Sequence, residues 1–217
     1  MTTFDDQPHR LAGGGAKGAG AAEYVPAVLD LPHLRAAARK CRGCGLYRQA
    51  TQTVFGAGPS NAAVVMVGEQ PGDQEDQQGQ PFVGPAGNLL DRAFAEVGID
   101  RDSVYLTNAV KHFKFVERGK RRIHKQPGRT EIVACSAWLA AELEVVGPNL
   151  VVCLGAIAAK AILGTDFKVS ERRGELVTLP AYRAIATMHP SSVLRAPDFE
   201  SAYADFVDDL RAVHDAM

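Results

Sequence analysis

Short runs of apolar residues alternate along the chain with segments that have the apolar spacing of helices. The runs are apolar almost throughout, as in strands that are buried on both faces of a sheet, and they cover residues 62–67, 104–110, 150–154 and 183–188. Helical spacing occurs at 33–40, 86–97, 130–146 and 156–163, and Asp198 can cap a last helix that runs nearly to the C-terminus. Strands that alternate with helices predict an α/β fold, a three-layer α/β/α sandwich with a central, mostly parallel sheet.

The first part of the chain differs in composition from the rest. Residues 1 to about 24 are rich in Gly and Ala and have no apolar period, which predicts a flexible tail before one domain over residues 25–217. The 217 residues, 46% hydrophobic and 23% charged, suit such a single domain. The chain shows neither a membrane-length apolar run nor the layout of a secretory signal, so we expect a cytoplasmic protein with no membrane partner.

Polar residues stand at the carboxyl ends of three predicted strands. Glu69 follows the first strand, Asn108 lies at the end of the second, and His189 follows the last. Ligands of open parallel sheets bind at this edge, so we expect the three side chains to share a site. A carboxylate can stabilise a developing cation, and a histidine can hydrogen-bond a developing anion. Each residue on its own also suits a simple role in ending a strand or capping a turn.

Two further features fit recognition of a nucleobase in DNA. The Asn108 amide offers one acceptor and two donors, which matches the N3–H and O4 edge of uracil and rejects cytosine. Phe82, in a loop rich in Gly and Pro, can stack on a base that is flipped out of the helix, or it can anchor the loop to the core. Ser191 and Ser192 can donate to phosphate, although serines also suit ordinary turns.

A basic segment follows the second predicted strand. Residues 114–129 carry seven Lys or Arg residues, among them Arg121 and Arg122, without apolar periodicity. This composition predicts a loop that faces phosphate, although most basic runs are simply solvated, and the formal net charge of the chain is only −1. His124 lies inside the segment. Beside DNA its imidazole can contact phosphate or, when neutral, attack a carbon atom.

Four cysteines are present, which in a secreted chain would suggest two disulfides, but in a cytoplasmic chain a close Cys-x-x-Cys pair is more often metal-binding or redox-active. Cys41 and Cys44 form a Cys-x-x-Cys pair, Cys135 lies on a predicted helix, and Cys153 lies in an apolar strand as a plain core residue. Three thiolates leave room for an imidazole ligand, for which His112 is the candidate. An iron–sulfur cluster and a tetrahedral zinc ion are both compatible with these ligands.

Several of these residues lie in motifs that resemble those of a known enzyme family. Residues 68–72 (GEQPG) with 79–87 (GQPFVGPAG) resemble the first motif of the iron–sulfur, family 4 uracil-DNA glycosylases. Residues 189–192 (HPSS) resemble the second motif, and 106–111 (LTNAVK) resemble the strand that selects uracil. The resemblance runs from about Leu31 to the C-terminus. It implies the uracil-DNA glycosylase fold, with Gly68, Gln70, Phe82 and Asn108 around the uracil and with Glu69 and His189 as catalytic residues.

The chain departs from family 4 in two places. His112 stands where that family has its third cysteine, and residues 120–124 (KRRIH) belong to an inserted loop. Both departures match the UdgX-type subgroup, which resembles family 4 but bonds covalently to uracil DNA through the histidine of this loop, here His124. The resemblance implies a [4Fe-4S] cluster whose ligands would be Cys41, Cys44, His112 and Cys135. It also suggests residues that touch phosphate or fill the gap left by the flipped base, namely Arg121, Arg122 and Arg195.

These observations predict a protein that excises uracil from DNA and remains attached to the sugar. We expect it to be a monomer that prefers single-stranded DNA and releases uracil as product, because flipping a base costs least in a single strand. An alternative is an ordinary uracil-DNA glycosylase that turns over with water. An alternative of another class is a non-catalytic, metal-containing module that binds nucleic acid.

Overall fold

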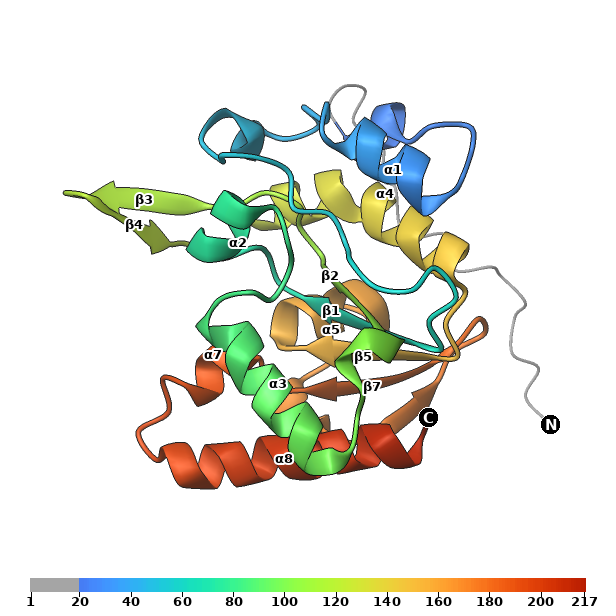
Figure 1. Cartoon of the computed structure of the whole chain (residues 1–217), viewed down its shortest axis with the longest axis vertical. Helices are drawn as coiled ribbons and strands as arrows, with labels where there is room; N and C mark the ends of the chain where they lie inside the picture. Colours follow the sequence, from blue (N-terminus) through green and yellow to red (C-terminus); the bar gives the residue numbers. More distant parts are fainter. Residues whose placement is uncertain (1–19) are drawn as a thin grey trace.

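The computed structural model describes residues 20–217 and has a five-stranded sheet at its centre (Figure 1). The strand order is β2-β1-β5-β7-β6. The strands are β1 (Val64–Gly68), β2 (Val104–Asn108), β5 (Leu150–Leu154), β6 (Leu176–Thr178) and β7 (Arg183–Thr187). The pairs β1–β2, β1–β5 and β5–β7 are parallel, and only β6 runs antiparallel to its neighbour β7. The expected mostly parallel sheet is therefore confirmed, with β6 as an edge strand that the apolar pattern did not reveal.

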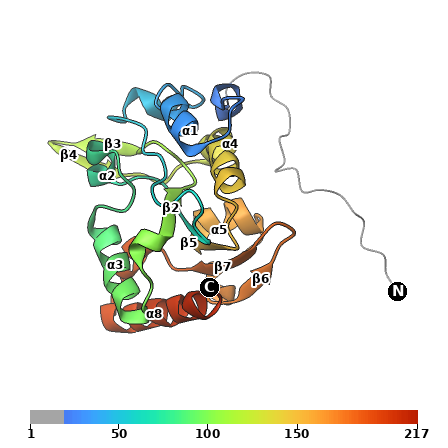
Figure 2. The ribbon, with the colours of Figure 1, turned by 45° about the vertical axis from the view of Figure 1, so that its right-hand side comes forward.

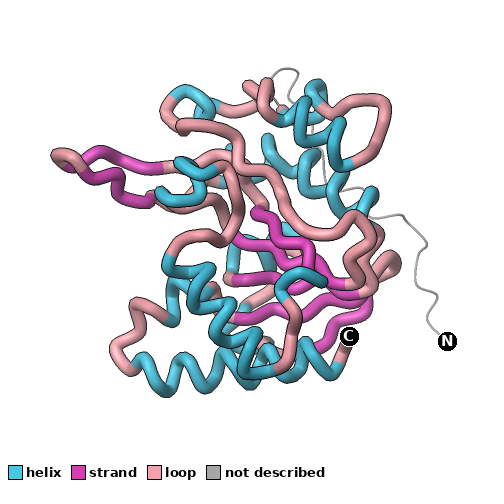
Figure 3. Tube along the Cα trace, viewed as in Figure 1, coloured by secondary structure: helices cyan, strands magenta, loops and turns pink. Residues whose placement is uncertain are grey.

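Helices cover both faces of the sheet, and the alternation of side chains along each strand explains why. In β1, Val65 and Val67 pack into one apolar cluster, whereas Val64 and Met66 pack into a second cluster on the other side. The first cluster includes residues of α1 (Leu31–Ala38), α4 (Arg129–Val146) and α5 (Ala156–Leu163). The second includes residues of α3 (Pro85–Val97) and α8 (Phe199–Asp215). Figure 3 shows the strands between these helices, which confirms the three-layer sandwich.

A two-stranded hairpin replaces the irregular loop that the basic segment predicts. It consists of β3 (Phe115–Arg118) and β4 (Arg121–His124), and it projects from the body of the molecule beside α2 (Asp73–Gln78) (Figures 1 and 2). Gly119 has a φ of +59° in the turn, a conformation that glycine adopts without strain. Phe115 pairs with His124 in the antiparallel register, so the hairpin sets the position of His124 from both strands.

The described residues include a short packed segment before residue 25. The predicted tail lies mainly outside the described residues, but its last residues form a 3-10 helix, η1 (Ala21–Tyr24), that contacts α4. Ala21 is buried, and a side chain at Gly43 would collide with the Ala21 amide nitrogen. Among residues 20–217, no helix is long and apolar enough to cross a membrane.

Candidate active site at the carboxyl edge of the sheet

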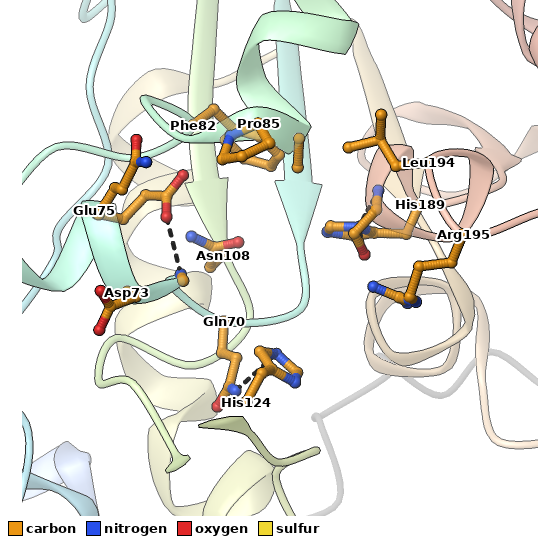
Figure 4. Close-up of a pocket in the computed structure, with 14 residues that line it drawn as sticks. Gln70, Asp73, Glu75, Phe82, Pro85, Asn108, His124, His189, Leu194 and Arg195 are labelled. Atoms are coloured by element: carbon orange, nitrogen blue, oxygen red, sulfur yellow. Dashed lines mark hydrogen bonds between the residues drawn. The ribbon is translucent and has the colours of Figure 1, made fainter. Parts of the chain in front are cut away.

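A pocket of about 450 Å³ opens beyond the carboxyl ends of the parallel strands (Figure 4). This volume lies in the range of small-molecule sites. Of the residues predicted to act together, seven line the pocket: Gln70, Phe82, Asn108, His124, His189, Ser191 and Arg195. Of the three side chains expected to share a site, Asn108 and His189 line the pocket, whereas Glu69 lies next to it, with its Oε1 3.6 Å from Nε2 of the lining residue His124. The pocket also has lining residues that we did not predict, including Asp73, Glu75, Pro85 and Leu194.

Asn108 enters the pocket from the last position of β2, opposite Gly68 in the parallel register. A Cβ atom at Gly68 would collide with Asn108 Oδ1 and would lie 2.7 Å from Phe82 Cζ, so any added side chain would displace one or both of these groups. The missing side chain thus lets an amide and an aromatic ring approach each other at the end of β1. An amide edge next to a ring face is an arrangement that can read and stack a planar base.

Phe82 is held in a backbone conformation that is unusual for an aromatic residue. Its φ is +56°, and it is the one described residue other than glycine with positive φ. The Arg101 guanidinium donates to the Phe82 carbonyl at 3.0 Å, and a side chain at Gly87 would collide with that carbonyl. The Phe82 ring is stacked near the His189 ring, with centroids 6.3 Å apart and planes inclined by 27°. Strain of this kind persists where the surroundings enforce it, often at functional sites.

His189 is neutral and presents a proton from Nε2. It follows β7 and caps the short helix α7 (Pro190–Val193), where its Nδ1 accepts a hydrogen bond from the Ser191 amide at 3.1 Å. Because Nδ1 is the acceptor, the proton of the neutral ring is on Nε2. Burial lowers the pKa of His189 to about 4, and the nearby His124 and Arg195 act in the same direction. The ring can therefore donate a hydrogen bond to an oxygen at neutral pH.

His124 is held by Gln70, whose side-chain amide donates to the lone pair on His124 Nε2. The Gln70 amide is oriented by the backbone, because its Oε1 accepts from Lys114 N at 3.1 Å and its Nε2 donates to Lys125 O at 2.9 Å. The same Nε2 lies 2.8 Å from His124 Nε2, which must then be the acceptor (Figure 4). Partial burial and Arg195 both lower the pKa of His124, which favours the neutral imidazole that a nucleophilic attack requires.

Glu69 lies next to this histidine at the start of the loop after β1. Its Oε1 is buried without a hydrogen-bond partner in the described part of the chain and lies 3.6 Å from His124 Nε2. Burial raises the pKa of Glu69, while Gln126 and Arg195 partly oppose this shift. An unpaired buried carboxylate oxygen is costly unless a ligand uses it. Its position suits interaction with positive charge that develops beside His124.

The two predicted DNA-contacting arginines of the hairpin have different surroundings. Arg122 is tied to α2, with Nε 2.5 Å from Asp73 Oδ1 and Nη1 2.6 Å from Asp76 Oδ2. Its guanidinium also lies over the rings of Phe113 and Phe115. Arg121, by contrast, is exposed at the turn of the hairpin. The contacts of Arg122 make it an anchor for the hairpin that carries His124, and a direct DNA contact by Arg122 stays a prediction.

The other residues predicted to contact DNA lie around the rim. Ser191 uses its amide and its hydroxyl on His189 Nδ1, and the Ser192 hydroxyl donates to the His189 carbonyl at 2.7 Å. Arg195 lines the pocket and is close enough to influence the pKa values of Glu69 and both histidines. Glu75, which we did not predict, accepts from Gly72 N at 3.1 Å and Gly84 N at 2.8 Å, so it ties the two pocket loops together.

The three cysteines predicted as ligands lie near one another. Within residues 20–217, no three His, Cys, Asp or Glu side chains converge on a point that would hold a single metal ion. Cys41 and Cys44 are nevertheless close enough to Cys135 to raise its pKa, which burial brings to about 12. Backbone amides point at two of the thiols, from Gly43 to Cys41 Sγ at 3.4 Å and from Lys111 to Cys135 Sγ at 3.3 Å.

The three thiols fit an iron–sulfur cluster, whose sulfurs commonly accept such hydrogen bonds, but among the described residues no contact joins the His112 ring to them. His112 follows Lys111, the residue whose amide contacts Cys135, and is therefore adjacent in the chain to this group. Its ring is buried, and its Nε2 lies 3.0 Å from Thr53 Oγ1. Burial lowers the pKa of His112 to about 4, so its ring is neutral, as a metal ligand must be. Cys153 lies fully buried in β5, as expected for a core residue.

The fold and the pocket define a class of α/β proteins with a base-sized site at the carboxyl edge of the sheet. A family model described as the uracil DNA glycosylase superfamily matches residues 55–211. The match covers more than half of the chain and includes every residue of the pocket. The chain belongs to the uracil DNA glycosylase superfamily.

Within this superfamily, the chain is similar to several curated type-4 enzymes. The chain is 35% identical over 175 residues to the type-4 uracil-DNA glycosylase of Archaeoglobus fulgidus, a match that covers 76% of the chain and 84% of the relative. It is 36% identical over 159 residues to the type-4 enzyme of Thermotoga maritima, covering 72% and 79%. For the type-4 enzyme of Pyrobaculum aerophilum the identity is 33% over 177 residues, covering 78% and 87%.

Proposed function

We propose that the protein excises uracil from DNA and then bonds covalently to the deoxyribose C1′ through His124. The observation that carries this proposal is the position of His124 Nε2, an acceptor nitrogen held 2.8 Å from Gln70 Nε2 and 3.6 Å from Glu69 Oε1. The relatives' names support uracil in DNA as the substrate. A neutral imidazole that is aimed into the pocket by a backbone-fixed amide supports the covalent step.

In the proposed complex, a deoxyuridine is flipped into the pocket and read before any bond breaks. Phe82 stacks on the base, and the Asn108 amide accepts from uracil N3–H and donates to O4. Cytosine presents an acceptor at N3 and a donor at C4, so the same amide orientation rejects it. The proposed reading of the base depends on the gap that Gly68 leaves between these two side chains.

Cleavage then breaks the C1′–N1 bond, and its electron pair leaves with uracil. The His189 Nε2–H donates to uracil O2 and stabilises this anion. The Glu69 carboxylate stabilises the positive charge on the sugar. The lone pair of His124 Nε2 forms the new C1′–N bond, and the proton of Nδ1 leaves the alkylated ring, so that the net products are neutral uracil and a sugar–imidazole bond. An imidazole is a poor leaving group from this carbon, so the enzyme acts once.

The proposed cofactor is a [4Fe-4S] cluster bound by Cys41, Cys44, His112 and Cys135. The close thiols and the amides that point at them support this assignment. The cluster would supply a structural clamp, since cleavage of a glycosidic bond transfers no electrons. It would join the segment before η2 (Gly45–Arg48) to α4 and to the turn after β2.

The test uses a labelled single-stranded oligonucleotide with one uracil and a denaturing gel, with a thymine oligonucleotide as control. We expect a uracil-dependent band shift that survives heat and detergent. His124→Ser should abolish the shift but leave strands that alkali cleaves at the uracil, because water can replace the imidazole. His214→Ser, an exposed histidine on α8, is the matched control and should keep the shift.

The outcomes separate the possible functions. A shift that persists in His124→Ser would remove the proposed nucleophile. Wild-type protein that gives alkali-sensitive strands but no shift would be an ordinary glycosylase, in which the unpartnered Glu69 Oε1 can position a water. Protein loaded with iron and sulfide that does neither would contradict the glycosylase proposal.

A further inference from the structure

A fully buried ion pair lies beneath the base-reading end of β2, and the chemistry proposed above does not use it. The ammonium of Lys111 and the carboxylate of Glu142 are in contact, and both side chains are about 0–1% exposed. Replacing a buried ion pair with apolar residues is often neutral or stabilising, so stability alone explains such a pair poorly. Its hydrogen bonds show what it holds in place.

Lys111 uses all three of its ammonium protons. Besides Glu142, they reach Thr107 Oγ1 at 2.7 Å and the backbone carbonyl of Asn108 at 2.7 Å. Asn108 is the last residue of β2, and a buried carbonyl at this position needs a donor. Lys111 supplies that donor from within the turn that follows the strand.

Both carboxylate oxygens of Glu142 also accept hydrogen bonds from other groups. Its Oε1 accepts from Gly56 N and from the Tyr105 hydroxyl, each at 3.0 Å, and Thr107 Oγ1 lies 3.0 Å from both carboxylate oxygens. Glu142 lies on α4 seven residues after Cys135, on the same face of the helix. Cys135 Sγ accepts from the backbone amide of Lys111, so α4 holds this residue at both its backbone and its side chain.

The same turn is bonded to the catalytic loop on its other side. Ala109 N donates to Gly68 O at 2.9 Å, and Val110 N donates to Glu69 O at 3.0 Å. The turn from Asn108 to Lys111 therefore connects α4, the base-reading amide and the end of β1. A shift of its backbone moves the Asn108 side chain relative to Gly68, and recognition of this kind tolerates errors of only about 0.5 Å.

We infer that Lys111, neutralised by Glu142, is a positioning residue that holds the Asn108 carbonyl so that the Asn108 amide stays aligned with the edge of uracil. This inference rests on the proposed function. Lys111 lies beneath the pocket and does not line it, so its effect reaches the base only through Asn108. Loss of the pair should weaken binding of the base more than binding of the DNA backbone.

The test measures free uracil as an inhibitor, because binding of the product base depends on base reading and not on cleavage. The variant Lys111→Met/Glu142→Gln removes both charges together and leaves no unpaired buried ion. A milder variant, Thr107→Val, removes one anchor of the ammonium and keeps the pair. Leu210→Ala, a buried core change on α8 away from the pocket, is the control for lost stability.

In each protein, one measures the uracil concentration that halves the initial rate on uracil DNA, the affinity for thymine DNA, the iron content and the melting temperature. We expect the double variant to need about tenfold more uracil, and Thr107→Val about threefold more, for a weakening of about 1.4 kcal/mol per tenfold. Affinity for thymine DNA should stay within about twofold, as expected for phosphate contacts that do not involve the turn. The control should bind uracil like the wild type.

Two results would overturn the inference. One is that the double variant and Thr107→Val are both inhibited by the same uracil concentration as the wild type. The other is a loss of uracil binding in Leu210→Ala equal to that in the double variant, which would reduce the effect to stability. Wild-type protein that neither reacts with uracil DNA nor responds to uracil would refute the proposed function, and this inference with it.

Discussion

The anchoring of the hairpin by Arg122 predicts that a single substitution separates capture of DNA from excision of uracil. Arg122→Met keeps an apolar stem over Phe113 and Phe115 and removes the charge that pairs with Asp73 and Asp76. Asp76 is fully buried, but it keeps the Thr51 N–H, which is shared between its two carboxylate oxygens at 3.0 and 3.1 Å. His124, two residues further along β4, depends on the docked hairpin.

The free energy that Arg122→Met removes from docking of the hairpin should lie between the values for buried and for exposed ion pairs. Removing one partner of a buried pair costs about 3–5 kcal/mol, and exposed pairs contribute about 0–1 kcal/mol. Asp76 retains one backbone donor, Thr51 N, and Asp73 is partly exposed, so we expect a loss of about 2 kcal/mol in docking of the hairpin. That loss lowers the ratio of docked to undocked hairpin about 30-fold. A misplacement of about 1 Å can itself cost about 100-fold in rate.

The assay compares covalent capture with base release in the same single-turnover reaction. Arg122→Met should lower the ratio of captured strand to alkali-cleavable strand at least tenfold, while total uracil release changes little. Arg121→Met is the matched control, because Arg121 is exposed at the neighbouring position, and it should leave the ratio unchanged within about twofold. Equal ratios in the two variants would refute the anchoring role. So would a parallel loss of release and capture in Arg122→Met.

Three further predictions follow from other parts of the structure. Gly68→Ala should lower the excision rate on uracil DNA at least tenfold without abolishing folding, because the added Cβ collides with Asn108 Oδ1; an unchanged single-turnover rate would contradict this view of the base slot. The neutral His189, with a pKa of about 4 against 6.5 in the unfolded chain, stabilises the fold fully above pH 6.5 and loses this contribution as the pH falls through 4. His189→Gln should therefore flatten the stability profile between pH 6.5 and 4, measured by denaturant unfolding, and a profile as steep as that of the wild type would exclude this contribution. Cys135→Ser should lower the iron content of the purified protein, whereas Cys153→Ser should not, and equal iron in both would remove Cys135 from the ligand set.

Much of the fold follows from local pattern alone. Continuous apolar runs such as 150–154 specify strands buried on two faces, and the chain order of strands and helices then restricts the topology to a parallel sheet. That topology also places Glu69, Asn108 and His189 at one edge before any coordinates are known. The hairpin was not predicted, because the basic side chains in 114–129 conceal the two apolar residues, Val116 and Ile123, that pair across its strands.

The roles of charged and polar side chains depended on tertiary contacts that local sequence does not encode. Gln70 and His124 are 54 residues apart in the sequence, and only the folded structure shows that the Gln70 amide orients the His124 ring. Arg122 has the sequence context of a phosphate ligand, yet its carboxylate partners come from α2. Lys111 ends the 106–111 motif, but nothing in the sequence indicates that β2 and α4 enclose it with Glu142. Apolar residues stabilise the fold through burial, and the periodicity of the sequence predicts which of them are buried. The effect of a charged residue depends on its nearest partner, and the packing of distant segments determines that partner.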